Sequence, residues 1–256
     1  MVILLIIFIL TSLLGAIPSE RDLIESRYFL IESEVEQDQL EIEELLQMLE
    51  GIRRKVGVDL NYYPEDKIAI KIYKSTKSFM SHTDKPWWLA AIYTEGKIHI
   101  QPLAILKKRG ILKTTLTHEY THLVIDRSVG GANCPQWLNE GIAQYEAGEW
   151  NHKKAEDIKS SLLNNPVLSI SEVERELANT KYRLNEQDKD RAYIAYLMTY
   201  TIVEYLVDNF GPINTLLTYL KEGKDIKESI EEGLEISYSG FERGWTQYLV
   251  GKYSGR

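Results

Sequence analysis

Two histidines and a glutamate in the segment HEYTH, residues 118–122, could hold and use a metal ion. Residues four apart on a helix lie one turn above each other, so His118 and His122 can direct two imidazole nitrogens at one point. A catalytic zinc site takes three protein ligands, and a second segment, WLNEG at residues 137–141, offers the carboxylate of Glu140. The residue types and their spacing therefore predict a zinc site.

Glu119 lies next to the first histidine in the sequence and suggests what such a site would do. Zinc lowers the pKa of a bound water to about 7, and a neighbouring carboxylate can then take up the water proton. The alternative is that this five-residue pattern lies on a surface helix whose His and Glu side chains bind no metal ion. The presence of Glu140 a short distance along the chain favours the metal site over this alternative.

Two helices are predicted to position these groups. The first runs from Thr114 or Thr115 to Arg127 and ends at Gly130-Gly131, and the second spans residues 136–147 after Pro135. Asp126 lies one turn beyond His122, and Gln144 lies one turn beyond Glu140. These two side chains either orient the ligands or are solvated helix residues.

The chain ahead of the metal helix alternates between strand and helix patterns. We expect strands at 27–33 and 67–73, a helix at about 35–55 ended by Gly57, and a hairpin of 88–93 with 97–101 turning at Glu95-Gly96. Residues 98–100 are either a sheet edge along which an extended peptide could lie or an ordinary internal strand. His99 within them is expected to be structural or at the surface.

The chain after the metal segments is predicted to be helical. A short helix is expected at 155–163, and Ser171 to Glu174 has the pattern of a capping box. Residues 191–207 carry apolar stripes on two sides, which predicts a buried helix with small helices packed around it. The predicted fold is α+β: a small mixed sheet with an early helix at 18–110, followed by a mainly helical zinc-binding part at 111–256.

Composition limits the partners and the location. The net charge of −8 argues against nucleic acid or anionic lipid as the main partner. Residues 2–14 are almost purely apolar, so we expect residues 1–17 to be a signal peptide or a membrane anchor and the rest to lie outside the cytoplasm, secreted or tethered. Cys134 is the only cysteine, so no intramolecular disulfide can form. It is expected to be a loop thiol, and the alternative is a contact with the metal, because it lies six residues before Glu140.

The order of these motifs resembles a known family. HEYTH at 118–122, PQWLNEG at 135–141 and a later tyrosine-bearing helix, AYLMTYTIVEYLV at 195–207, resemble the peptidase MA-like domain of the gluzincin metallopeptidases, relatives of the M1 aminopeptidases. The similarity extends from about residue 25 to the C-terminus. Seventeen residues separate His122 from Glu140 where the M1 pattern has eighteen, and the aminopeptidase motif that captures a free amino terminus has no counterpart.

The resemblance implies zinc bound by His118, His122 and Glu140, with Glu119 as general base. It also implies an oxyanion-stabilising tyrosine, which the spacing of the M1 helix assigns to Tyr196; Tyr193 and Tyr200 share its stripe and remain alternatives. The expected function is zinc-dependent hydrolysis of a peptide or protein substrate. A catalytically inactive extracytoplasmic binding domain of the same fold, and a zinc hydrolase acting on other bonds, are the alternatives.

Overall fold

The computed structural model describes residues 22–178 and 186–254 and divides the chain into two compact units. Of the described residues, the first unit holds 22–50 together with 64–112, and the second holds 51–63 together with 113–178 and 186–254. The apolar segment 1–17, which is expected to be a signal peptide or a membrane anchor, lies outside the described residues. No helix in the described part of the chain is long and apolar enough to cross a membrane.

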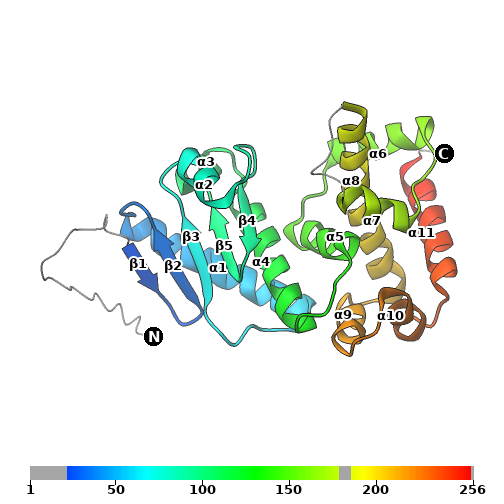
Figure 1. Cartoon of the computed structure of the whole chain (residues 1–256), viewed down its shortest axis with the longest axis horizontal. Coiled ribbons are helices and arrows are strands. Elements are labelled where there is room, and N and C mark those ends of the chain that lie inside the picture. The colour runs from blue at the N-terminus through cyan, green and yellow to red at the C-terminus, as the bar shows by residue number, and fades with distance from the viewer. Residues whose placement is uncertain (1–21, 179–185, 255–256) are drawn as a thin grey trace, which may run out of the picture. The chain divides into compact units, whose positions relative to one another are not determined.

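A mixed sheet of five strands forms the first unit (Figure 1). The strands follow the order β1-β2-β3-β5-β4, in which β2, β3 and β5 are parallel and the two outer strands run antiparallel to their neighbours. Their bounds are β1 Asp22–Glu25, β2 Phe29–Ser33, β3 Ile68–Ile72, β4 Ala91–Thr94 and β5 Lys97–Ile100. The strands expected at 27–33, 67–73, 88–93 and 97–101 are all present, and β1 was not anticipated.

The hairpin turns as its sequence predicted. Glu95 and Gly96 have φ angles of 52° and 75°, the left-handed pair that a two-residue hairpin turn requires. The assignment of residues 98–100 to a sheet edge, however, is wrong. β5 pairs with β3 on one side and with β4 on the other, so β4 is the outer strand and β5 is internal.

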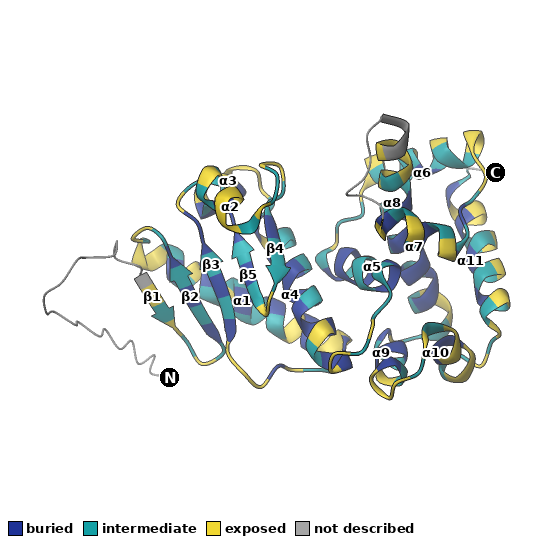
Figure 2. Cartoon of the chain, viewed as in Figure 1, coloured by how far each residue is buried: buried dark blue, intermediate teal, exposed yellow. Residues whose placement is uncertain are grey.

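One face of this sheet is apolar and buried (Figure 2). The alternate residues Ile31, Ile70 and Ile98 lie side by side in the register of three strands and are 0–1% exposed. Helix α1, Gln39–Asp59, connects β2 to β3 and buries Leu45 and Leu49. The helices α2, Thr76–Thr83, and α3, Leu103–Lys108, complete the unit.

Helix α1 continues past Gly57, where the sequence suggested that it would end. The left-handed residue at its end is instead Asn61, with φ of 50°, and the backbone N–H of Tyr62 donates to the carbonyl of Gly57. Asparagine adopts this conformation more readily than most residues. A Cβ on Gly57 would lie 2.2 Å from the Tyr63 ring. Glycine at this position of the helix therefore makes room for the close approach of that ring.

The second unit is helical, and most of its helices pack against α8. Its helices have the following bounds: α4 Leu112–Val129, α5 Gln136–Ala147, α6 His152–Asn164, α7 Ile170–Ala178, α8 Glu186–Phe210, α9 Asn214–Lys221, α10 Ile226–Gly233 and α11 Tyr238–Tyr253. The central part of α8, from Ala195 to Leu206, is largely buried, which confirms the buried helix predicted from its two apolar stripes.

The capping box ahead of α7 lies two residues earlier than its sequence suggested. The backbone N–H of Ser169 donates to Glu172 Oε2 at 2.9 Å, and the backbone N–H of Glu172 donates to Ser169 Oγ at 3.2 Å. Both pairs, Ser169 with Glu172 and Ser171 with Glu174, have the spacing of a capping box. Glu174 is unavailable for that role because its carboxylate binds the start of α5.

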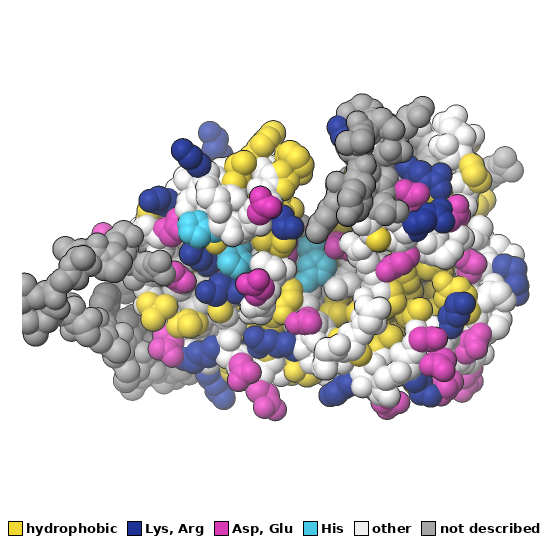
Figure 3. Space-filling model, viewed as in Figure 1, with side chains coloured by type: hydrophobic (Ala, Val, Ile, Leu, Met, Phe, Trp, Pro, Cys, Tyr) yellow, Lys and Arg dark blue, Asp and Glu magenta, His cyan; other side chains and the backbone are white. Residues whose placement is uncertain are grey.

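Lysine and arginine side chains are interspersed with aspartate and glutamate on the face of the molecule that Figure 3 displays. The five-stranded mixed sheet, followed by the helices from α4 onwards, agrees with the overall α+β prediction of a small mixed sheet followed by a mainly helical part.

Candidate metal centre

The predicted metal ligands lie on two helices of the second unit. His118, Glu119 and His122 are on α4, and Glu140 is in the second turn of α5. The two N-terminal N–H groups of α5, on Gln136 and Trp137, donate to the two carboxylate oxygens of Glu174 on α7 at 2.9 and 2.8 Å. A carboxylate at a helix N-terminus also interacts favourably with the helix dipole.

Helix α5 lies close to α8 at Gly141, the residue after the predicted ligand Glu140. A Cβ on Gly141 would lie 2.4 Å from the backbone oxygen of Thr199 and 2.7 Å from Val203 Cγ2. Only glycine permits this approach. Gln144, one turn further, donates to the backbone oxygen of Tyr196 and to Thr199 Oγ1, both at 2.8 Å. The position of Glu140 is thus fixed by α7 and α8.

The three ligand atoms converge. His118 Nε2 lies 3.0 Å from His122 Nε2, and Glu140 Oε2 lies 3.6 Å from the former and 3.9 Å from the latter. A point equidistant from three atoms at these separations is about 2.1 Å from each, which matches zinc–nitrogen and zinc–carboxylate bond lengths. Among the described residues this is the group of His, Cys, Asp and Glu side chains arranged to hold a metal ion.

The three side chains are partly accessible, as a catalytic metal site requires. The exposed fractions are 12% for His118, 14% for His122 and 23% for Glu140. A structural zinc site is usually closed by four protein ligands, whereas three ligands leave a position for water or substrate. The donor set of two imidazoles and one carboxylate therefore fits a catalytic metal ion.

Negative charge is concentrated around the two histidines. Burial alone would lower the pKa of His118, but its contacts with Glu140 and Glu149 and the charge of Glu119 raise that pKa to about 10. Burial alone would raise the pKa of Glu140, yet the two histidines hold it below its usual value. The site favours a positive charge at the position where the ligand atoms meet.

Each histidine ligand has a second contact on its other ring nitrogen. Asn139 Oδ1 accepts from His122 Nδ1 at 2.7 Å, and Glu149 Oε1 lies 2.7 Å from His118 Nδ1, although not in good alignment for a hydrogen bond. Such contacts fix the ring orientation and leave Nε2 as the metal-binding atom. Sequence reasoning missed both residues. Asn139 precedes a predicted ligand, which was a usable signal, but Glu149 lies beyond the end of α5 at no helical spacing from the site.

Asp126 and Gln144 are the two residues that the sequence suggested for orienting the ligands. Asp126 is exposed on α4, and the ring nitrogen that it was expected to orient is bonded to Asn139. Gln144 is buried and connects α5 to α8 instead of supporting a ligand. Asp126 therefore follows the alternative of a solvated helix residue, whereas Gln144 follows neither alternative.

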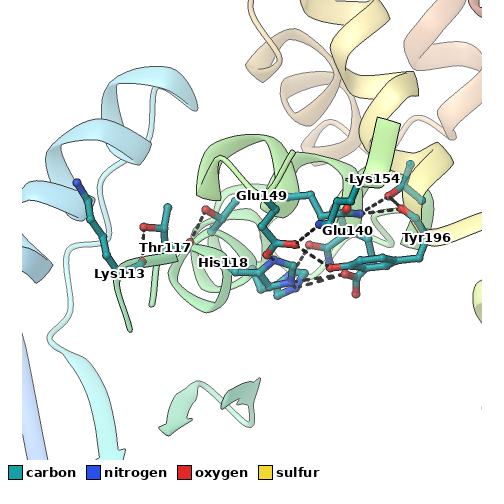
Figure 4. A network of polar contacts seen from close by, with 12 residues as sticks. Lys113, Thr117, His118, Glu140, Glu149, Lys154 and Tyr196 are labelled. Atoms are coloured by element: carbon teal, nitrogen blue, oxygen red, sulfur yellow. Dashed lines mark hydrogen bonds and ion pairs between the residues drawn. The ribbon is translucent and has the colours of Figure 1, made fainter. Parts of the chain in front are cut away.

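Glu119 and Tyr196 lie near the ligand group. Glu119 is 8% exposed, and its charge contributes to the raised pKa of both His118 and Tyr196. The Tyr196 hydroxyl lies 3.4 Å from Glu149 Oε2, and Figure 4 shows its ring beside Glu140 and His118. Burial first, and then the charges of Glu149, Glu140 and Glu119, raise the pKa of Tyr196 well above its ordinary value. The phenol therefore remains a hydrogen-bond donor.

The two alternative tyrosines make different contacts. Tyr193 is 40% exposed and donates to Asp157 of α6 at 2.9 Å. The Tyr200 ring stacks on Trp150 with ring centroids 4.4 Å apart. Of the three, Tyr196 is the one that contacts a side chain bound to a predicted metal ligand.

The remaining histidine and cysteine candidates lie elsewhere. His99 Nδ1 is bonded to the Tyr73 hydroxyl at 2.8 Å within the first unit. Cys134 is half-buried, and burial, with a smaller effect from Glu174, raises its thiol pKa to about 12. Such a thiol is a poor metal ligand at neutral pH.

A comparison with protein families agrees with this geometry, whereas a comparison with curated proteins gives no significant match to the chain. A family model described as the peptidase MA superfamily matches residues 50–251, which include every helix that carries the candidate site. The superfamily is typically metal-dependent, and its fold is metallopeptidase-like. The chain belongs to the peptidase MA superfamily.

Proposed function

We propose that this protein is a zinc-dependent metallopeptidase of the gluzincin type that hydrolyses a peptide or protein substrate. The observation that carries the proposal is the convergence of His118 Nε2, His122 Nε2 and Glu140 Oε2 within bonding distance of a common point. Zinc held there would supply a Lewis acid that polarises the scissile carbonyl and activates the attacking water.

The side chains around that point match the remaining needs of amide hydrolysis. Glu119 accepts the proton of the attacking water and passes it to the leaving amine. Tyr196, kept protonated by its raised pKa, donates a hydrogen bond to the developing oxyanion. Asn139 and Glu149 keep the two imidazole rings oriented.

The test replaces Glu119 with glutamine, which keeps the shape of the side chain and removes its basicity. Glu119→Gln should bind zinc with the wild-type stoichiometry, measured by elemental analysis, and should lose at least about a thousandfold of the turnover of a diverse peptide mixture. Glu156→Gln, an exposed residue of α6, is the matched control and should cleave as the wild type does. Undiminished proteolysis by Glu119→Gln would refute the mechanism.

The same experiment separates the rival functions. Cleavage by the wild type must disappear with a chelator and return with zinc. Stoichiometric zinc without cleavage of any peptide would indicate a binding domain of the same fold, and hydrolysis of esters or other bonds alone would indicate a different zinc hydrolase.

We further propose that the protein acts outside the cytoplasm, either secreted or tethered through residues 2–17. The support is the apolar composition of that segment. The acidic net charge argues against nucleic acid as a partner. Cell fractionation with and without residues 1–17 tests the location, and recovery of both forms in the cytoplasm would exclude it.

A further inference from the structure

Glu149 occupies a position in this site that its sequence does not suggest. Helix α5 ends at Gly148, whose φ of 64° turns the chain, and the backbone N–H of Glu149 then donates to the carbonyl of Gln144 at 3.1 Å. Glycine adopts this left-handed conformation without strain. The turn returns Glu149 toward the ligand-bearing part of the unit.

The two oxygens of the Glu149 carboxylate have different partners. Oε1 lies 2.7 Å from His118 Nδ1, and Oε2 lies 3.1 Å from Lys154 Nζ and 3.4 Å from the Tyr196 hydroxyl. Figure 4 shows Glu149 between the His118 ring on one side and Lys154 and Tyr196 on the other. The same carboxylate thus contacts a predicted metal ligand and the predicted oxyanion donor.

The side chain of Glu149 is only 17% exposed, and an ammonium group lies beside it. Lys154 is placed in the first turn of α6, where its backbone N–H donates to the capping side chain of Asn151. A carboxylate beside Nδ1 of a histidine ligand fixes the orientation of the ring and leaves Nε2 to bind a metal ion.

The two contacts differ in length. Glu149 Oε1 lies 2.7 Å from His118 Nδ1, whereas the O–H···O distance of 3.4 Å to Tyr196 is long and weak. The phenol of Tyr196 can therefore leave Glu149 for an oxyanion at little cost.

We propose that Glu149 is a positioning residue that joins the two halves of this site, orienting the His118 ligand through one carboxylate oxygen and keeping the Tyr196 phenol beside the metal position through the other. This inference rests on the proposed function, but its first test does not require catalysis.

That test measures zinc affinity of the full chain by competition with a chromophoric chelator. Glu149→Gln should weaken zinc binding about 10- to 100-fold, the usual effect of losing a carboxylate partner of a histidine ligand. Glu149→Asp keeps the charge but is one methylene shorter and cannot reach His118 Nδ1 in the same position, so it should weaken binding similarly. Glu156→Gln on α6 should leave affinity unchanged.

The results separate positioning from simple charge. Weakening by Glu149→Gln but not by Glu149→Asp would mean that only the negative charge matters, which would overturn the proposal. Unchanged affinity in both variants would also overturn it. Melting curves of the chelator-treated proteins show whether each variant is folded, and Glu149→Asp, as the milder change, keeps the test decisive if Glu149→Gln does not fold.

A second test concerns Tyr196 and is made at saturating zinc. If Glu149 affects turnover through this phenol, Glu149→Gln should lower kcat several-fold in the wild type and have no further effect in Tyr196→Phe. Additive losses would overturn the link to Tyr196. Should no peptide be cleaved, the proposed function fails, whereas the affinity measurements still decide whether Glu149 positions His118.

Discussion

At the scale of single residues, the site depends on which atom of each side chain is left to act. His122 and His118 present Nε2 to a common point because Asn139 and Glu149 occupy their Nδ1 atoms. Tyr196 remains a donor because burial and three nearby carboxylates keep its proton in place. The chemistry thus requires neighbours that select one nitrogen or retain one proton, in addition to the ligands themselves.

Tyr196→Phe tests the role of the phenol directly. Loss of one hydrogen bond to an oxyanion typically lowers kcat about 100- to 1000-fold, and zinc affinity should stay at the wild-type value because the phenol is not a ligand. Peptide turnover and chelator competition measure the two quantities. Tyr193→Phe is the matched control on the same helix, since its hydroxyl binds Asp157, and a comparable loss in that variant would contradict the assignment.

At the scale of elements, helix α5 is fixed at both ends of the segment that carries Glu140. Glu174 of α7 holds its N-terminus, and Gly141 allows α8 to approach within a distance that no Cβ would permit. Gln144 adds two hydrogen bonds to α8, one of them to the backbone of Tyr196. The third ligand and the phenol are therefore placed by the same helix contact.

Gly141→Ala should disturb that contact. The new methyl would meet the backbone of Thr199, which cannot move aside as a flexible side chain could, so we expect a loss of about 1–3 kcal/mol in the free energy of unfolding. Weaker zinc binding should accompany the loss. Urea unfolding measures the stability.

Gly51→Ala is the control for this prediction. Gly51 lies within α1 with nothing within 4 Å of its Cβ position, so alanine should stabilise the protein by about 0.5–1 kcal/mol through its higher helix propensity. Equal stability of Gly141→Ala and wild type would show that α5 and α8 can separate without cost.

At the scale of the whole molecule, one buried acid connects stability to pH. Glu146 of α5 is 3% exposed and pairs with Lys55 of α1. Burial raises the pKa of Glu146 to about 7, although Lys55 opposes the shift. Lys55 is half exposed, and the pKa of its ammonium rises under the influence of Glu146, so it stays charged throughout this range. Burial of the Glu146 carboxyl therefore decides the direction in which its pKa shifts.

The sign of the pH dependence follows from this shift. Because the folded state retains the proton of Glu146 up to about pH 7 and the unfolded state loses it near pH 4.5, the folded state binds more protons between these values. The contribution of this group to the free energy of unfolding should fall by on the order of 1–3 kcal/mol as pH rises from 4.5 to 7.

Glu146→Gln isolates this contribution, because glutamine does not titrate. Urea unfolding at several pH values between 4.5 and 8 should show that the variant lacks this part of the decline, while Glu156→Gln retains it. Parallel profiles for Glu146→Gln and wild type would mean that Lys55 keeps Glu146 ionised across the range.

The sequence by itself determined the parts of this protein that depend on neighbours along the chain. The spacing of His118 and His122 places both imidazoles on one side of a helix through the helical period alone. Glu95-Gly96 specifies the hairpin turn through the φ angles that these two residues tolerate. The stripes of α8 reveal burial on two sides. These inferences hold because periodicity and turn chemistry act over a few residues.

Only the tertiary structure decided which distant groups meet. The order of the strands, which makes β5 internal, follows from long-range pairing that the strand sequences leave open. Glu149 reaches His118 because α5 ends in a left-handed turn, and Lys154 in the first turn of α6 lies beside it. No helical or strand spacing in the sequence indicates this contact. The choice between two capping boxes was made by the contact of Glu174 with α5. In each case the local sequence allows more than one arrangement, and packing between elements selects one.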